Sequence, residues 1–298
     1  MTPSRVALVV LAAGVLAGTR VWLGRALRVW RAERAELTWQ PPPGYAELPA
    51  DREGIEEIRE VSWALADGSR QRAFYLPPRN GAVVVYAHGS PGTGIGRLRE
   101  ARALAGDGFG ALLLDLPGYG GSEGRRTWGR GFREAVAAAV DYVAARPEAR
   151  HIGGFGYSMS TALMAQAAAD DPRLEAIVLL TPFTRSQEQL HHQFRSRIPG
   201  LSHVAILSAR HHGLAVDELD TTQAMRRLGP RPVLLVAGEH DGAIPLWMPR
   251  QLKDLSPGAE LWIVPGAGHE GFAREFGEVY LERIRAFYRL HLLGDPPR

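Results

Sequence analysis

Three residues that together could activate a hydroxyl nucleophile each follow an apolar run in this sequence. Ser158 follows "HIGGFGY", Asp241 follows "RPVLLVAGEH" and His269 follows "AELWIVPGAG". A serine hydroxyl is a weak nucleophile until a base takes its proton, and histidine suits that role because its pKa lies near neutrality. A carboxylate fixes the tautomer of the histidine and stabilises the imidazolium that forms. The order serine, aspartate, histidine therefore predicts acyl transfer through a covalent intermediate on Ser158, with Asp241 as the acid and His269 as the base.

Each of these residues, taken alone, has a simpler interpretation. Ser158 is also typical of a helix N-cap, Asp241 could cap the helix that opens near Pro245, and His269 could lie in a surface loop. Glu239 is a rival acid because, in a strand, it would share a face with Asp241, although Asp241 lies nearer the strand end. The common position after predicted strands, together with the order along the chain, favours the catalytic interpretation.

Apolar runs and helical patterns alternate along the part of the chain that contains these residues. Runs such as "AVVVYAHGS" and "GALLLDLPG" are typical of strands buried on both faces. Strands are predicted at residues 57–65, 71–77, 82–90, 110–118, 151–158, 175–183, 231–241 and 259–269, the first two as a hairpin turned by "ADGS". Helices are predicted at residues 97–106, 129–146, 159–170, 246–255 and 273–292. The pattern predicts an α/β fold with a mostly parallel central sheet, helices on both faces, and functional residues at the carboxyl ends of the strands.

From about residue 55 to the C-terminus the sequence resembles an α/β-hydrolase, in the Bem46-like and serine aminopeptidase-like branch. The residues that carry the resemblance are "AHGSPGTG", "DLPGYGGSEG", "GFGYSMS", "LLTPFTR", "AGEHDGAIP" and "VPGAGHEGF". The resemblance implies a nucleophile at Ser158, an acid at Asp241 and a base at His269. It also implies an oxyanion hole formed by the backbone N–H groups of Ser90 and Met159.

One position departs from the pattern of that family. The stretch around the nucleophile is usually Gly-x-Ser-x-Gly, and here Ser160 occupies the last position. The sharp turn at the nucleophile needs small neighbours because strand and helix approach closely there. Since serine is nearly as small as glycine, we expect the turn to keep its geometry.

Residues 184–230 interrupt the alternation of strands and helices and are predicted to form a helical cap over the active site. Tyr119 and Trp128 are candidates to line the substrate entrance, or else they only pack in the core.

The favoured function is hydrolysis of a carboxylic ester or thioester of a small-molecule or lipid acyl substrate. A serine aminopeptidase-type peptidase is the first alternative, because the cap carries four carboxylates that could hold a free amino terminus: Glu188, Asp217, Glu218 and Asp220. A non-catalytic binding protein with this fold is the second alternative.

The first 54 residues are predicted to lie outside the catalytic domain of residues 55–298. Residues 1–35 read as a hydrophobic anchor with a basic flank, and residues 36–54 read as a proline-rich linker. Within the anchor, residues 6–24 are apolar enough for a single membrane helix. Four arginines follow that segment and one precedes it, which predicts a cytoplasmic catalytic domain. A cleaved signal peptide, which would give a secreted or periplasmic enzyme, and a simple buried helix are the alternatives.

The composition excludes several other classes of function. The chain has 298 residues, a formal net charge of +3 and no cysteine, so disulfides, thiolate catalysis and cysteine-bound metals are excluded. The arginines are scattered and no nucleic-acid-binding motif is present, so we expect no nucleic-acid partner. The adjacent pairs His191-His192 and His211-His212 would point apart on a helix, so we expect no metal site and no cofactor. The sequence leaves the oligomeric state open.

Overall fold

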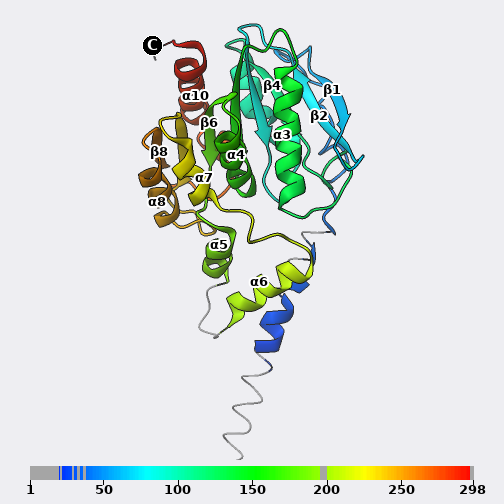
Figure 1. Cartoon of the computed structure of the whole chain (residues 1–298), viewed down its shortest axis with the longest axis vertical. Helices are drawn as coiled ribbons and strands as arrows, with labels where there is room; N and C mark the ends of the chain where they lie inside the picture. Colours follow the sequence, from blue (N-terminus) through cyan, green and yellow to red (C-terminus); the bar gives the residue numbers. More distant parts are fainter. Residues whose placement is uncertain are drawn as a thin grey trace, which may run out of the picture.

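The buried run AVVVYA forms strand β3 (Ala82–Ala87) near the middle of the central sheet in the computed structural model of the protein (Figure 1). The structure describes residues 20, 22–28, 30–31, 34–35, 38–194 and 200–295. These residues form an eight-stranded sheet in the order β1-β2-β4-β3-β5-β6-β7-β8. The other strands are β1 (Arg59–Ala64), β2 (Arg70–Leu76), β4 (Gly110–Leu114), β5 (His151–Tyr157), β6 (Leu174–Leu180), β7 (Val233–Gly238) and β8 (Ala259–Val264).

The direction of the strands brings the predicted site residues to one edge of the sheet. Strands β1 and β2 form the predicted antiparallel hairpin, and β2 pairs antiparallel with β4. Every pair from β4 to β8 is parallel. The carboxyl ends of β5, β7 and β8 therefore lie at the same edge, where the loops that carry Ser158, Asp241 and His269 begin.

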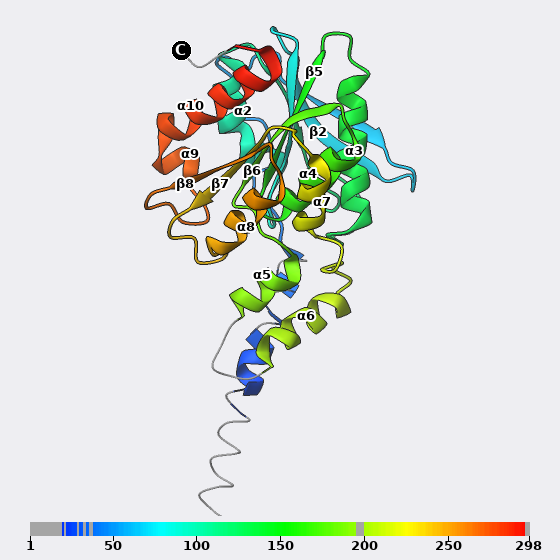
Figure 2. The ribbon, with the colours of Figure 1, turned by 60° about the vertical axis from the view of Figure 1, so that its left-hand side comes forward.

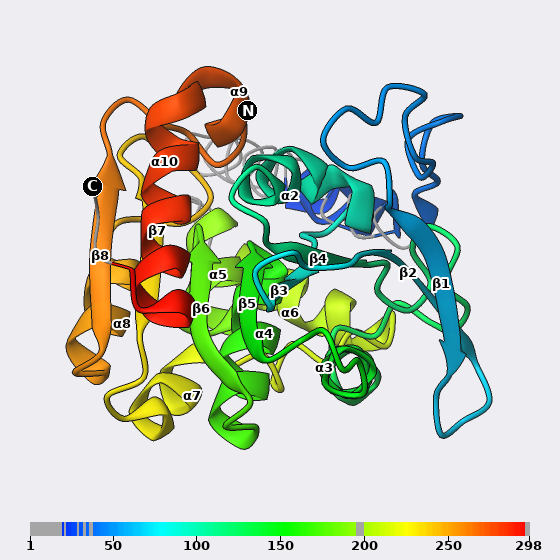
Figure 3. The same ribbon diagram turned by 90° about the horizontal axis from the view of Figure 1, so that it is seen from above.

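Helices cover both faces of the sheet, as the alternation in the sequence predicts (Figure 3). One face packs against α3 (Arg130–Ala144), α4 (Met159–Asp170), α7 (Thr221–Leu228) and α8 (Trp247–Leu255). The other packs against α2 (Leu98–Ala105), α9 (Phe272–Glu275) and α10 (Gly277–Tyr288). The single C-terminal helix predicted at residues 273–292 is divided into α9, α10 and a short π-helix, Arg289–Leu293. The break between α9 and α10 coincides with Gly277, whose φ of +46° does not fit a continuous right-handed helix.

The cap is smaller than the interval predicted for it. Helices α5 (Ser186–Gln193) and α6 (Leu201–His211) lie beyond the carboxyl ends of the strands, away from both faces of the sheet (Figures 1 and 2). Helix α7 falls within residues 184–230 but packs on the sheet layer, because its apolar residues Ala224, Met225 and Leu228 join the main core. The part that stands away from the sheet is therefore α5 and α6 with their connecting segments.

Described residues of the N-terminal segment lie beside the cap (Figure 2). Ala26 packs against Leu201 and Ala205 of α6, and the ring centroids of Trp30 and His212 are 5.8 Å apart. Most of the apolar segment predicted as an anchor, residues 6–19 and 21, lies outside the described residues. None of the helices in the described part of the chain combines the length and apolarity that crossing a bilayer requires.

Candidate active site

Ser158 sits on a strained turn between β5 and α4. Its backbone has φ +51° and ψ −115°, a conformation that L-residues with a side chain rarely adopt. The turn brings β5 and α4 close together, since a Cβ atom on Gly156 would lie 2.5 Å from the carbonyl oxygen of Ser160. Glycine is therefore required at position 156. Such backbone strain is typical of a functional position, whereas an ordinary N-cap serine has an unstrained, extended backbone.

The side chains of Ser158, His269 and Asp241 form a connected series of hydrogen bonds. The Ser158 Oγ lies 3.0 Å from His269 Nε2, and His269 Nδ1 lies 2.8 Å from Asp241 Oδ2. Because the carboxylate can only accept, Nδ1 carries the proton and Nε2 is left to accept the serine proton. The arrangement can therefore activate the serine hydroxyl.

The second oxygen of Asp241 is also bonded. Its Oδ1 accepts hydrogen bonds from the backbone N–H groups of Ala243 at 2.8 Å and Ile244 at 2.9 Å. The side chain is only 2% exposed, so its position is fixed by these contacts and by His269. Glu239, the rival acid, accepts from the backbone N–H of Gly266 at 2.9 Å and is about half exposed. Asp241, and not Glu239, is thus the carboxylate that contacts His269.

The loop after β3 is held by a buried histidine, His88, for which the sequence pattern predicts no role. His88 Nδ1 lies 2.6 Å from the carbonyl oxygen of Gly89, so this nitrogen carries the proton. Nε2 accepts a hydrogen bond from the backbone N–H of Leu116 at 3.1 Å. Burial lowers the pKa of His88 to about 4, so the ring is neutral near pH 7. His88 therefore fixes the backbone immediately before Ser90.

The predicted oxyanion-hole residues lie in the wall of the same cavity as Ser158 and His269. This cavity includes Ser90 and Met159 in its lining. Met159 is the first residue of α4, so its N–H group lies at the positive end of the helix dipole. The Ser90 hydroxyl is 2.6 Å from the hydroxyl of Tyr119. Backbone groups with this placement can stabilise a developing oxyanion.

Tyr119 and Trp128 occupy different environments. Tyr119 is 1% exposed, and its ring packs edge-to-face against His88 with centroids 5.1 Å apart. The structure thus differs from the predicted place of Tyr119 at the substrate entrance, because its ring is part of the core and only its hydroxyl reaches Ser90. Trp128 lines the cavity beside Ser158, and its role in binding substrate stays a prediction.

The cavity beside Ser158 has a volume of about 280 Å³ and a mainly apolar wall. Residues of helix α5 line this cavity on the cap side, and residues that follow the strands line it on the side of the sheet. Its apolar lining residues are Trp128, Met159, Phe183, Leu190, Phe194, Leu214, Leu219, Ala243 and Ile244. A wall of this kind suits a hydrocarbon or aromatic acyl group.

The four cap carboxylates considered for an amino-terminus site all contact arginines. Arg185 pairs with Glu188 at 3.1 Å and with Asp220 at 3.0 Å. Arg210 pairs with Asp217 at 2.7 Å, and Arg133 lies 3.8 Å from Glu218. None of the four carboxylates belongs to the described lining of the cavity beside Ser158.

Two protein-family models and a protein of Mycobacterium tuberculosis match this sequence. The family model described as serine aminopeptidase, S33, matches residues 78–228, and a model described as TAP-like protein matches residues 210–283. The uncharacterized protein Rv2307c of Mycobacterium tuberculosis is 28% identical over 270 residues, which cover 87% of this chain and 88% of that protein.

Solved structures show the same fold at lower sequence identity. The Pyrococcus furiosus esterase Pf2001 superposes with a TM-score of 0.68 and 17% identity, over 85% of this chain and 97% of the esterase. Est1E from Butyrivibrio proteoclasticus, solved with ferulic acid bound, gives a TM-score of 0.63 and 18% identity, over 79% and 100% of the two chains. These likenesses confirm the predicted α/β-hydrolase fold.

Proposed function

Because this chain belongs to the serine aminopeptidase S33 family of α/β hydrolases, we propose that it cleaves carboxylic esters or thioesters through an acyl-enzyme on Ser158. The observation that carries the proposal is the hydrogen-bonded series Ser158–His269–Asp241, which opens into an apolar cavity of about 280 Å³. A nucleophile, a base and an acyl-sized space thus meet at one point.

The reaction proceeds in two halves. Ser158 Oγ attacks the carbonyl carbon of the ester while its proton moves to His269 Nε2, and the oxyanion is stabilised by the N–H groups of Ser90 and Met159. His269 then gives the proton to the departing alkoxide or thiolate, which leaves the acyl group on Ser158. A water molecule, activated by His269, attacks the acyl carbon and releases the carboxylic acid. Asp241 stabilises the imidazolium in both halves.

The character of the cavity favours an ester over a peptide with a free amino terminus. An ammonium group in a binding site needs a carboxylate or several hydrogen-bond acceptors beside it. The carboxylates of the cap are paired with arginines, and the cavity wall is mainly apolar. Aminopeptidase action remains the alternative function because of the family to which the chain belongs.

The test is hydrolysis of a series of nitrophenyl esters from acetate to palmitate by the wild type and by Ser158→Ala. We expect turnover by the wild type and a loss of at least about 1000-fold in the variant. Circular dichroism of Ser158→Ala checks that the variant is folded. Full activity in that variant would exclude Ser158 as the nucleophile. Absence of ester turnover, with release of amino acids from peptides, would establish the alternative.

We also propose that residues 6–24 hold the enzyme at a membrane, with the catalytic domain in the cytoplasm. Support comes from the apolar sequence of that segment, from the packing of Ala26 on helix α6 and from the contact of Trp30 with His212, directly after that helix. These contacts keep Ala26 and Trp30 next to the cap. Cell fractionation of the full chain and of a form lacking residues 1–24 tests the proposal. Equal recovery of both forms in the soluble fraction would contradict it.

A further inference from the structure

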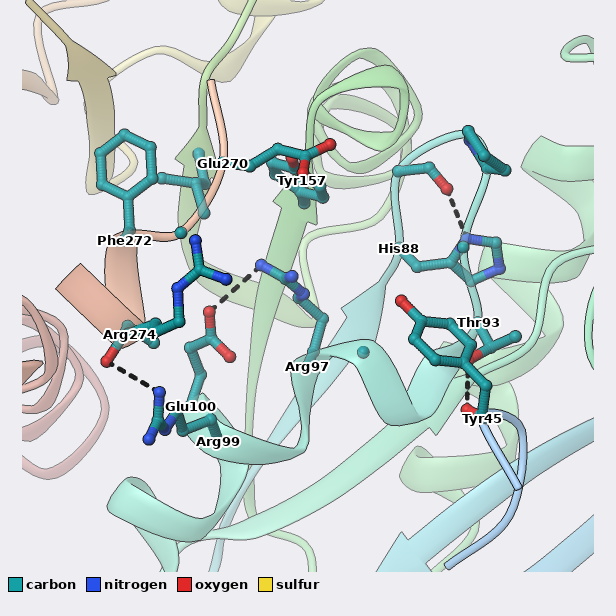
Figure 4. Close-up of a pocket in the computed structure, with 17 residues that line it drawn as sticks. Tyr45, His88, Thr93, Arg97, Arg99, Glu100, Tyr157, Glu270, Phe272 and Arg274 are labelled. Atoms are coloured by element: carbon teal, nitrogen blue, oxygen red, sulfur yellow. Dashed lines mark hydrogen bonds and ion pairs between the residues drawn. The ribbon is translucent and has the colours of Figure 1, made fainter. Parts of the chain in front are cut away.

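A second cavity, called the polar cavity here because charged and polar side chains form much of its lining, is drawn in Figure 4. Its volume is about 240 Å³. Gly89, Tyr157 and Glu270 line it, and each is the direct neighbour in sequence of a residue that lines the apolar cavity. The two cavities therefore share the loops after β3, β5 and β8 as a common wall. The proposed ester hydrolysis uses only the apolar cavity.

Three arginines line the polar cavity from two regions of the chain. Arg97 ends the short 3-10 helix Gly94–Arg97, Arg99 lies in the first turn of α2, and Arg274 lies in α9. Figure 4 shows the three side chains extending from these separate elements, with Glu100 between them. Like charges repel, so such a convergence is stabilised by negative charge between the arginines, of which Glu100 supplies one unit through its ion pair with Arg97.

Arg97 is the most buried of the three, with a side chain 20% exposed. It pairs with Glu100 at 3.2 Å, and its guanidinium lies 4.4 Å from the centre of the Tyr157 ring. Its Nε atom is buried and has no hydrogen-bond acceptor among the described residues. A buried donor without a partner is costly, so an acceptor atom brought next to this group would be stabilising.

The three arginines have partners of different strength. Arg274 pairs with Glu275 at 2.8 Å, but both side chains are largely exposed, so this ion pair is weak and a ligand can replace it. Glu100 is buried and accepts hydrogen bonds from both Arg97 and the hydroxyl of Tyr280, so it is already engaged. Arg99 donates to the carbonyl oxygen of Ala273 at 3.4 Å, which is a neutral partner. Glu270, the second carboxylate in the lining, is exposed to solvent.

We propose that this cavity binds the phosphoryl group of a phosphate monoester through Arg97, Arg99 and Arg274. A phosphoryl group presents several oxygens in a tetrahedral array, so guanidinium groups can approach it from different directions, whereas a carboxylate presents two oxygens in one plane. The phosphoryl group belongs either to the leaving group of the substrate or to a separate small molecule that acts on the adjacent loops. Binding does not require turnover, so this site is testable even if the proposed ester hydrolysis fails.

The binding test is calorimetric titration of the full chain with glycerol 3-phosphate, inorganic phosphate and glycerol, repeated with Ser158→Ala. We expect both phosphate probes to bind, more weakly at high salt, and glycerol not to bind. The double variant Arg99→Gln/Arg274→Gln changes two exposed residues and should weaken binding about tenfold. Arg283→Gln, an exposed arginine of α10 outside the cavity, is the matched control and should have no effect.

Glu270→Gln should change the affinity for phosphate probes in the opposite direction from the double arginine variant. Because it removes a negative charge from the cavity, it should tighten glycerol 3-phosphate binding about threefold. A purely structural role of the arginines would not produce this gain. Failure of both phosphate probes to bind the folded wild type, or equal binding by the double variant, would overturn the proposal.

Inhibition of ester hydrolysis distinguishes the two sources of the phosphoryl group. Competitive inhibition by glycerol 3-phosphate would support a phosphorylated leaving group, because substrate and inhibitor then share the cavity. A change in kcat without competition would support a separate ligand that acts on the loops after β3, β5 and β8.

Discussion

The hydroxyl of Ser160 donates a hydrogen bond to the backbone carbonyl of His88 and so joins the first turn of α4 to the loop after β3. Both residues are buried. The bond connects the helix that follows the nucleophile with the loop that carries Ser90. It also explains the departure from the Gly-x-Ser-x-Gly pattern, because glycine at position 160 could not make this contact. The serine thus has a positioning role in addition to its small size.

Removal of this bond should reduce activity more than stability. We expect Ser160→Ala to lower the free energy of unfolding by about 1 kcal/mol, as is usual for one neutral hydrogen bond. The kcat for ester hydrolysis should fall about tenfold because the oxyanion-hole loop loses a support, while KM changes little. Steady-state kinetics and urea unfolding measure the two effects.

Ser208→Ala is the matched control for that variant. Ser208 lies in helix α6, and its hydroxyl is buried without a hydrogen-bond partner among the described residues. Its removal should leave kcat unchanged and cost no stability. An equal loss of kcat in both variants would show that the effect of Ser160→Ala is not specific to the His88 contact.

The low pKa of His88 predicts a dependence of stability on pH. Burial lowers the pKa from its ordinary value of 6.5 to about 4. Between these values the unfolded chain binds a proton at this ring and the folded chain does not. The free energy of unfolding should therefore fall as the pH decreases from about 6.5 to about 4, and His88 should contribute no pH dependence above that range. The full contribution is about 3 kcal/mol.

Urea unfolding from pH 4.5 to pH 7.5 measures this contribution, with His88→Gln as the comparison. Glutamine keeps one donor and one acceptor but does not titrate. The slope of stability against pH below pH 6.5 should be smaller in the variant by up to about one bound proton. Identical slopes would mean that His88 titrates normally in the folded protein.

Two carboxylates in the loop after β7 allow a matched test of the predicted acid. Asp241→Asn keeps the shape of the side chain but can present its amide N–H to His269, which favours the wrong tautomer. We expect kcat to fall about 1000-fold or more. Glu239→Gln alters a half-exposed side chain that contacts Gly266, and kcat should stay within about threefold of the wild type. The reverse ranking of the two variants would assign the acid to Glu239.

The sequence was sufficient to predict the sheet, most of its helices and the residues that meet at its carboxyl edge. This was possible because parallel strands buried on both faces leave continuous apolar runs, and because their ends share one edge. Ser158, Asp241 and His269 each directly follow such a run, so they could be predicted as site residues without knowledge of the packing. The hydrogen bonds of 3.0 Å and 2.8 Å between them were not predictable, since they depend on loop geometry.

The remaining differences between the sequence-based predictions and the structure come from contacts between segments that are distant in the chain. Tyr119 read as a candidate for the substrate entrance, but it packs with His88 in the core. Helix α7 read as part of the cap, although its apolar face packs on the sheet layer. The sequence around His88 does not predict its buried hydrogen bonds, and in the sequence the arginines of the polar cavity are only part of a scattered positive charge. In each case the partner lies on another element, which periodicity does not identify.

The size of the acyl group should be set by helix α5 of the cap. Leu190 is 6% exposed and lines the cavity beside Ser158, so Leu190→Trp should fill part of the acyl space. Each methylene that no longer fits forfeits about 0.8 kcal/mol of burial, so kcat/KM for decanoate and longer esters should fall about tenfold or more. Turnover of the acetate ester should change little, and it also shows that the variant is folded. Leu207→Trp is the matched control, since Leu207 lies on α6 and is 62% exposed. If long-chain turnover falls equally in both variants, or is unchanged in Leu190→Trp, the acyl group occupies another part of the molecule.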